Sequence, residues 1–250
     1  MKLSVIMPVY NRERYVVPAL RSLLRQRDAA DLDIIVIDDG STDGSAKAVR
    51  AMMDEAPCIR LFQQTNKGVA RARNHGLRQL LPQTEFISFL DSDDISPAGR
   101  FKADLGRFEA DPSLELTYSL IKLVDSMDDE ALEPAANTRS LTVRGLSLSA
   151  GIFTRKLVDR TGGFDEAFSQ AEDTDYLLRI FESGARFVMP DTVATYYRRH
   201  PGNMTKARDV PLREYLRAIH KSMSRRKANP SLRMVEGIFD LRDSAGWRFM

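Results

Sequence analysis

Apolar and polar positions alternate along the first hundred residues in a way that predicts strands followed by helices. Short apolar runs rich in strand formers lie at 2–8, 32–38, 59–64 and 85–91. Apolar residues recur at helical spacing in the segments between them, at 12–26, 45–53 and 69–81. Short apolar strands separated by amphipathic helices favour right-handed βαβ crossovers and a mainly parallel sheet that helices cover on both faces. The first half of the chain is therefore expected to form an α/β fold.

The second half of the chain is less regular. Residues 126–139 are polar and acidic and contain a proline, which predicts a loop and a candidate lid. Residues 172–183 carry a helical apolar stripe that Gly184 should end, and residues 188–199 are expected to be extended. Residues 212–227 predict an amphipathic basic helix. Its apolar face would consist of Leu212, Tyr215, Leu216, Ile219 and Met223.

Composition places the chain among globular proteins. Its 250 residues are 43% hydrophobic and 29% charged, enough to bury a sizeable core. The 37 basic and 35 acidic side chains nearly cancel, so no global field favours nucleic acid, and no nucleic-acid partner is expected. The lone Cys58 cannot form an internal disulfide, and the apolar run before Asn11 is too short for a signal peptide. We expect a cytoplasmic protein that does not span a membrane, because no apolar run reaches about 18 residues.

Polar clusters follow all four strands predicted in the first hundred residues. They are Tyr10 and Asn11, Asp38 and Asp39, Asn66 and Lys67, and the carboxylates from Asp91 to Asp94. Ligands of such sheets bind beyond the carboxyl ends of the strands, so these residues are expected to line one site. Each cluster also has a purely structural interpretation, because DGSTDG is a good N-cap and turn sequence and Asn66-Lys67-Gly68 suits an ordinary turn.

The stretch FLDSDD, residues 89–94, has the chemistry of a cation site. Its Asp-x-Asp spacing on a turn can bring carboxylates to one hard, oxygen-seeking cation, although DSDD would also cap a helix before Pro97. No glycine-rich phosphate loop and no GxGxxG follows the first strand. A metal is therefore the expected means of neutralising bound phosphate.

Three further side chains could take part in catalysis or metal binding. Glu172 and Asp173 begin a predicted helix, where carboxylates favour the helix dipole, and one of them could instead act as a general base. His200 follows an extended segment and could be a metal ligand or a solvated turn histidine.

Seven ordered motifs together resemble one known family. They are SVIMPVYN, IVIDDGSTDGS, NKGVARARNHG, FLDSDD, GGFDE, AEDTDYLLR and YRRHPGN, which cover roughly four-fifths of the chain from Lys2 to Thr205. In this order and spacing they look like the inverting family 2 glycosyltransferases of GT-A fold. The resemblance implies a Rossmann-like, mainly parallel sheet in a GT-A domain at 1–205. It divides that domain into a nucleotide-sugar-binding half at 1–100 and an acceptor half at 101–205, followed by a C-terminal helical extension at 206–250.

The resemblance also assigns roles to site residues. It implies a donor-binding set of Pro8, Val9, Tyr10, Asn11, Asp39, Lys67, Arg71, Arg73, Asp91, Ser92 and Asp93. Asp93 would hold Mn²⁺ or Mg²⁺, with His200 and Asp91 as further metal ligands. Asp173 would be the catalytic base and Glu172 would orient the acceptor or the base. The role of Asp94 stays open. The family's tryptophan after the acidic pair is absent, since Thr174 and Tyr176 stand in that stretch, which leaves the acceptor platform undefined.

The implied activity is transfer of a sugar from a nucleotide diphosphate sugar, a UDP-sugar by expectation, to an acceptor hydroxyl with inversion. The acceptor would be a saccharide or a lipid-linked saccharide in cell-surface polysaccharide or glycolipid synthesis. Two alternatives are a nucleotidyltransferase, which would need a glycine-rich loop where VYNRERY has none, and a non-catalytic nucleotide- or sugar-binding module. The helix at 212–227 suggests peripheral contact with the inner face of a membrane, unless its apolar stripe packs on the domain.

Overall fold

The computed structural model of the chain describes residues 1–203, 209–234, 236–238 and 240–243. Its helices and strands follow in the order β1 (Lys2–Val9), α1 (Val16–Leu24), β2 (Asp31–Asp38), α2 (Ser45–Glu55), β3 (Ile59–Gln63), α3 (Val69–Arg78), β4 (Phe86–Phe89), α4 (Arg100–Ala110), β5 (Leu116–Tyr118), β6 (Leu120–Val124), β7 (Met127–Asp128), β8 (Glu133–Pro134), β9 (Ser140–Arg144), the short 3₁₀ helix η1 (Leu148–Ala150), β10 (Gly151–Thr154), α5 (Arg155–Thr161), α6 (Glu172–Glu182), β11 (Phe187–Val188), β12 (Val193–Arg198), α7 (Asp209–Ala228) and β13 (Asp240–Asp243).

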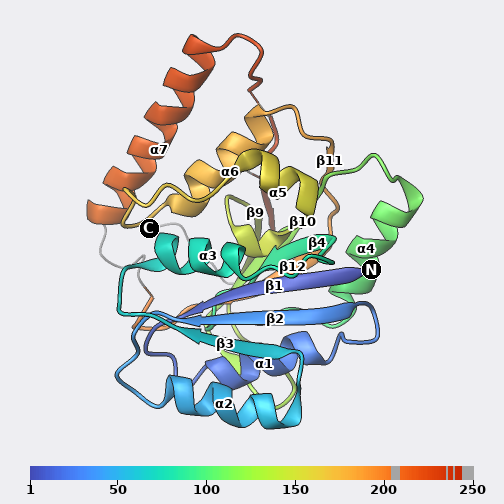
Figure 1. Cartoon of the computed structure of the whole chain (residues 1–250), viewed down its shortest axis with the longest axis vertical. Coiled ribbons are helices and arrows are strands. Elements are labelled where there is room, and N and C mark those ends of the chain that lie inside the picture. The colour runs from blue at the N-terminus through green and yellow to red at the C-terminus, as the bar shows by residue number, and fades with distance from the viewer. Residues whose placement is uncertain (204–208, 235, 239, 244–250) are drawn as a thin grey trace.

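A seven-stranded sheet forms the centre of the molecule, with the strand order β11-β5-β10-β4-β1-β2-β3 (Figure 1). The four neighbours β4, β1, β2 and β3 are parallel, and β10 runs antiparallel between β4 and β5. This mixed, mainly parallel sheet with flanking helices confirms the predicted fold class.

Both faces of the sheet are buried, which explains the nearly continuous apolar runs of its strands. Alternate residues of β1 pack in opposite directions because successive side chains of a strand point to opposite faces. Ile6 packs in the core that α3, α5 and α6 cover, whereas Val5 and Met7 pack in the core beneath α1, α2 and α4. In Figure 1, α3, α5 and α6 lie above the sheet and α1 and α2 lie below it.

The predicted helix at 12–26 begins later than expected, at Val16. Pro18 has no backbone N–H and is tolerated only in the first turn of a helix. Residues 12–15 instead form a turn in which the N–H groups of Tyr15 and Val16 both donate to the carbonyl of Arg12. This turn carries Arg12 to the end of β1, where the site lies.

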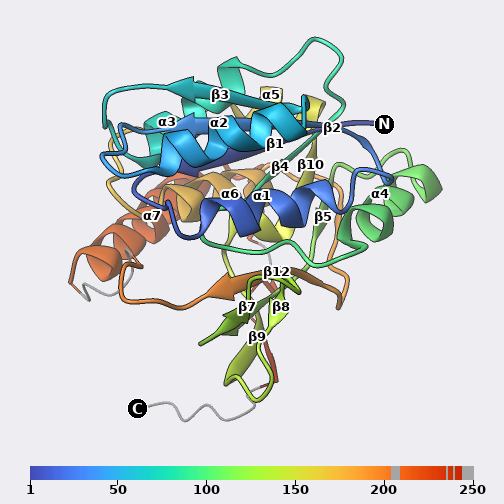
Figure 2. The same ribbon diagram turned by 90° about the horizontal axis from the view of Figure 1, so that it is seen from below.

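A four-stranded sheet, β12-β6-β9-β13, lies beside the main sheet (Figure 2). The predicted loop at 126–139 belongs to this side of the molecule and contains the β7–β8 hairpin. Arg25 at the end of α1 donates to the carbonyl of Leu132, and Asp129 pairs with Arg198 of β12. None of residues 126–139 lines the site cavity in this structure, so the candidate lid stays a prediction.

Of the two alternatives for the apolar stripe of α7, packing on the domain or exposure, the structure shows three of its five residues exposed. Leu212, Leu216 and Met223 are 60%, 57% and 57% exposed. The buried positions are Glu214, Ala218 and Ser222, one turn apart on the other face of the helix.

Buried ion pairs hold α7 on α6. Arg225 binds Asp175 at 2.7 Å and Glu182 at 3.0 Å, and Arg226 also binds Glu182 at 3.0 Å. Both carboxylates are only 2% exposed, so each needs a cationic partner, and these partners set the rotation of α7.

The C-terminal segment does not continue as helix. Strand β13 pairs antiparallel with β9, so the expected helical extension at 206–250 contains a strand that joins the smaller sheet. The expected domain boundary at 205/206 lies outside the described residues. Among the helices that the structure does describe, none is long and apolar enough to cross a bilayer.

Candidate active site

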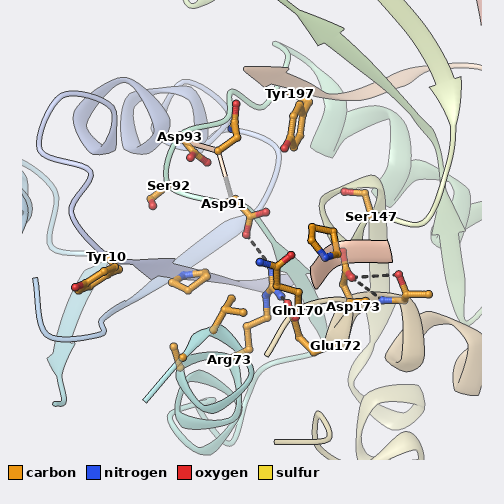
Figure 3. A pocket seen from close by; sticks show the side chains of 18 of the residues that line it. Tyr10, Arg73, Asp91, Ser92, Asp93, Ser147, Gln170, Glu172, Asp173 and Tyr197 are labelled. Atoms are coloured by element: carbon orange, nitrogen blue, oxygen red, sulfur yellow. Dashed lines mark hydrogen bonds and ion pairs between the residues drawn. The ribbon is translucent and has the colours of Figure 1, made fainter. Parts of the chain in front are cut away.

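A cavity of about 1000 Å³ opens at the carboxyl ends of β1, β2 and β4 (Figure 3). This is the edge at which ligands of open α/β sheets bind. Ten of the residues with expected donor-binding, metal or catalytic roles line the cavity, namely Pro8, Val9, Tyr10, Asp39, Arg73, Asp91, Ser92, Asp93, Glu172 and Asp173. Asn66, from the polar cluster after β3, lines it as well. Asn11, Lys67, Arg71 and His200 do not line it directly.

Tyr10 and Asp39 mark one end of the cavity. Tyr10 follows β1 and is 45% exposed, an aromatic ring available to a planar ligand. Asp39 follows β2, and its carboxylate accepts bonds of 2.8 Å from the backbone N–H groups of Lys67 and Gly68. Asp39 therefore fixes the turn between β3 and α3, and the Lys67 side chain stays exposed.

The two arginines of the ARARN stretch have different surroundings. Arg71 pairs with Glu166 at 2.9 Å on the surface, where both side chains are more than 40% exposed. Arg73 is 5% exposed and lies between Asp91, at 2.8 Å, and Glu172. Arg73 thus joins the acidic turn after β4 to the acidic pair of α6 (Figure 3).

The other two carboxylates of the acidic turn have separate partners. Asp93 Oδ2 accepts from Arg12 Nε at 2.8 Å and lies 3.0 Å from His200 Nε2. Burial raises the pKa of Asp93, but the contacts with His200 and Arg12 outweigh burial and leave its pKa below the ordinary value. Asp94 is 1% exposed and accepts from the Arg198 backbone N–H at 3.0 Å, so it ties this turn to β12.

A divalent cation is the cofactor that this donor set would suit. Asp93 and His200 supply an oxygen and a nitrogen donor, a combination suited to Mn²⁺. Asp91 instead faces Arg73, and within the described part of the chain no three His, Cys, Asp or Glu side chains form a metal site together. The remaining ligands would have to come from a diphosphate and water, which is usual for a nucleotide-bound cation.

The hydrogen bonds of His200 bear on its expected role as a ligand. The Gly202 backbone N–H donates to His200 Nδ1 at 3.1 Å, so the proton of the neutral ring lies on Nε2 and points at Asp93. Metal binding through Nε2 would therefore require the proton to move and the Gly202 bond to break.

Glu172 and Asp173 occupy the first turn of α6 at the far end of the cavity. Ala171 precedes them in the left-handed region with φ 60°, and this conformation turns the chain into the helix beside the cavity. Burial raises the pKa of Glu172 to about 7, although Arg73 opposes the shift. Burial also raises the pKa of Asp173, and here Arg73 and the Thr174 N–H oppose it.

Sequence reasoning missed several residues of the site. Arg12, Ser147, Gln170, Ala171, Tyr197 and Tyr215 all line the cavity, and none of them was assigned to the site from the sequence. Arg12 could have been found, since it continues the polar cluster after β1. Ser147, Tyr197 and Tyr215 come from three distant segments whose convergence no local pattern signals.

Comparisons with known proteins agree with this geometry. Residues 4–117 match the sequence model described as glycosyl transferase family 2. The chondroitin synthase of Escherichia coli is 28% identical over 227 residues, which are 89% of this chain and 32% of that protein. The chain spans less than two thirds of the length of each of the first curated relatives that it matches.

Two solved structures share the fold. Residues 1–349 of Staphylococcus aureus TarS, crystallised with UDP-GlcNAc, superpose with a TM-score of 0.72 at 23% identity, over 90% of this chain and 66% of that one. The mannosyltransferase PcManGT of Pyrobaculum calidifontis, with GDP-Man and Mn²⁺, gives a TM-score of 0.62 at 22% identity, over 91% and 64% of the two chains. The fold, the cavity and these matches agree: residues 4–117 match glycosyltransferase family 2, and the chain has the GT-A fold.

Proposed function

We propose that this glycosyltransferase moves a sugar from a UDP-sugar to an acceptor hydroxyl with inversion, in the synthesis of a cell-surface polysaccharide or glycolipid. The observation that carries the proposal is Arg73, which joins Asp91 of the acidic turn to Glu172 beside Asp173 in one cavity. A donor site and a candidate base are thereby held at a fixed separation. TarS with UDP-GlcNAc and the chondroitin synthase support this choice of donor and pathway.

Asp173 is the proposed general base. Burial raises the pKa of Asp173, so its carboxylate is a stronger base and accepts a proton from an alcohol more readily. Tyr10 and Asp173 lie toward opposite ends of the cavity, with Asp91 and Arg73 between them (Figure 3). A donor with its base beside Tyr10 would point its sugar toward Asp173. The acceptor oxygen would then lose its proton to Asp173 and attack the anomeric carbon opposite the departing UDP.

The proposal includes metal dependence. A divalent cation at Asp93 and His200 would supply Lewis-acid neutralisation of the diphosphate leaving group. The Mn²⁺ in the PcManGT structure supports this part of the proposal.

Tyr197 and Tyr215 are the proposed acceptor platform in place of the absent tryptophan. Both line the cavity, together with Leu146 and Ser147. Tyr176, the aromatic residue of the α6 motif, is fully buried and stacks on Phe164 with ring centroids 4.2 Å apart, so it cannot contact an acceptor. Aromatic rings with a polar edge suit the apolar faces and hydroxyls of a saccharide.

The first test is binding of UDP, GDP, dTDP and CDP, each with and without Mn²⁺, measured as a shift in melting temperature. A ligand at about 100 times its dissociation constant stabilises the fold by roughly 2.7 kcal/mol, which is readily detected. A shift with UDP that requires Mn²⁺ is expected. A shift with GDP alone would overturn the assignment of the donor.

The second test is the Asp173→Asn variant, which keeps the side-chain shape and removes the base. It should keep the UDP shift and lose a factor of about 10²–10⁴ in transfer from labelled UDP-sugars. An active variant would reject Asp173 as the base. Binding without any transfer by the wild type would favour a non-catalytic module, and a nucleotidyl product would favour the nucleotidyltransferase alternative.

Contact with the cytoplasmic face of a membrane through residues 212–227 remains part of the proposal. Leu212, Leu216 and Met223 offer exposed apolar side chains, whereas Lys221, Arg225 and Arg226 are engaged with carboxylates. Co-sedimentation with anionic vesicles should weaken in a Leu216→Glu/Met223→Glu variant. Equal sedimentation of variant and wild type would remove the membrane contact from the proposal.

A further inference from the structure

Arg12 is a cation of the site that the proposed mechanism does not use. Its guanidinium contacts its own loop and two segments that are distant in the sequence. Nε donates to Asp93 Oδ2 at 2.8 Å, Nη1 donates to the Asn11 carbonyl at 3.0 Å, and Nη2 donates to the Gly202 carbonyl at 3.1 Å. The backbone N–H of Arg12 is fixed as well, by the Ser45 hydroxyl at 2.8 Å. These four hydrogen bonds hold both the backbone and the guanidinium of Arg12 in place.

The contact between Arg12 and Asp93 uses the oxygen that also faces His200. Asp93 Oδ2 receives both Arg12 Nε and His200 Nε2, so the oxygen nearest the second candidate metal donor already has two partners. The Arg12 and Asp93 side chains are 18% and 13% exposed. Ion pairs of such low exposure are screened little by salt, and breaking them leaves a costly unpaired charge.

We propose that Arg12 competes with the divalent cation for Asp93 Oδ2 and thereby makes metal binding depend on the nucleotide diphosphate. A divalent cation at this oxygen would displace Arg12 and repel its charge. A diphosphate offers the displaced guanidinium a new partner, because arginine binds phosphate oxygens in a bidentate manner. Metal and diphosphate would therefore bind together much more strongly than either binds alone.

The resulting coupling between metal and diphosphate is reciprocal, as any coupling between two ligands must be. The factor by which UDP tightens Mn²⁺ binding equals the factor by which Mn²⁺ tightens UDP binding. Arg12 adds to that factor, because it opposes the metal when UDP is absent and supports the diphosphate when UDP is present. Removal of Arg12 should reduce the coupling from both sides.

The test measures Mn²⁺ affinity of the intact chain by the EPR signal of free Mn²⁺, with and without saturating UDP. It compares the wild type with Arg12→Gln, which removes the charge, and Arg12→Lys, which keeps it. Arg14→Gln is the matched control, since Arg14 is exposed two residues away and lies over the Tyr15 ring rather than at Asp93. A melting curve of each variant reports whether it is folded.

In the absence of UDP, Arg12→Gln should bind Mn²⁺ about tenfold or more tightly than the wild type, whereas Arg12→Lys and Arg14→Gln should not. With UDP present the gain should disappear, so that the coupling factor falls at least tenfold. Unchanged or weaker Mn²⁺ binding by Arg12→Gln without UDP would overturn the inference and leave Arg12 as a loop-holding residue.

The inference rests on the proposed donor and metal site, and the same titration separates the two failures. Wild-type protein that binds no Mn²⁺ even with UDP would refute the proposed metal site and the inference together. Wild-type protein that binds Mn²⁺ with UDP, accompanied by an Arg12→Gln variant without tighter Mn²⁺ binding, would refute the role of Arg12 alone.

Discussion

Replacing Arg73 with methionine should destabilise the protein in a way that depends on pH. Arg73 is 5% exposed and pairs with two carboxylates of different exposure, Asp91 at 41% and Glu172 at 6%. Methionine keeps most of the apolar stem and removes the charge. Asp91 can then be hydrated, so the loss of the Arg73–Asp91 pair should lower the free energy of unfolding by only about 0–1 kcal/mol. Glu172 stays buried and loses its cationic partner.

The size of the effect follows from the protonation of Glu172. Without Arg73 the pKa of Glu172 should rise above its present value of about 7, so that the side chain is neutral in the folded variant at pH 7. The unfolded chain ionises near 4.5, the ordinary value. In the variant, each pH unit above that value favours the unfolded state by about 1.4 kcal/mol. Relative to strongly acidic pH, the variant therefore loses about 3.4 kcal/mol of stability at pH 7 and less than about 1 kcal/mol at pH 5.

The sign follows from proton linkage. Between pH 4.5 and the raised pKa, the folded variant binds more protons at Glu172 than the unfolded chain does, so its stability falls as the pH rises. The wild type, whose Glu172 pKa is about 7, loses nearly as much stability up to pH 7, about 3 kcal/mol by the same relation, and little above that pH. The difference in stability between wild type and variant should therefore change by less than about 1 kcal/mol from pH 5 to pH 7. Above pH 7 it should grow by up to about 1.4 kcal/mol per pH unit, until the pKa of Glu172 in the variant is reached.

Urea unfolding at pH 5, 7 and 9 measures this difference. Arg71→Met is the matched control, because the Arg71–Glu166 pair is exposed on both sides and should contribute about 0–1 kcal/mol at every pH. The double variant Arg73→Met/Glu172→Gln should recover most of the loss at pH 9, since it leaves no buried ionisable group without a partner. A loss that is equal at pH 7 and pH 9 would refute this reasoning.

Two further predictions concern catalysis and packing. Because ionised Asp173 is the proposed base and burial raises its pKa, the transfer rate should fall on acidification with a midpoint above the ordinary value of 3.8, and a rate that stays constant down to pH 4 would contradict the assignment. In α3, a Cβ on Gly76 would lie 2.5 Å from Ile6 Cγ2, so Gly76→Ala should cost about 1–3 kcal/mol in urea unfolding. Gly106→Ala in α4, with nothing within 4 Å of the new Cβ, should instead be neutral or stabilising by up to about 1 kcal/mol, and equal effects at both sites would contradict the packing argument.

The order of strands and helices in the first half of the chain was predictable from the sequence. Strand and helix impose different local periods, and the β1, β2 and β3 segments carry apolar runs because helices cover both faces of the sheet. Polar residues at strand ends converged as expected because parallel strands share one carboxyl edge. The strand and helix pattern was therefore enough to predict that Tyr10, Asp39, Asp91 and Asp93 lie at one site, and all four line the cavity.

The partners of these side chains depended on the tertiary structure. Arg73 meets Glu172 across 99 positions, and Arg12 meets Asp93 across 81. No local rule specifies contacts at such separations. The sequence resemblance could not distinguish Arg71 from Arg73, whereas burial between two carboxylates separates them plainly.

Helix α7 is the clearest case in which packing overrode the sequence pattern. Its existence followed from local propensity and spacing, but its apolar stripe did not decide which face is buried. Two carboxylates of α6, Asp175 and Glu182, are removed from water and need cations, and Arg225 and Arg226 provide them. The sequence by itself determined which segments became strands and helices, because those choices depend on neighbours a few residues away. Only the tertiary structure decided which charges meet, because the cost of burying an unpaired charge is set by residues far apart in the chain.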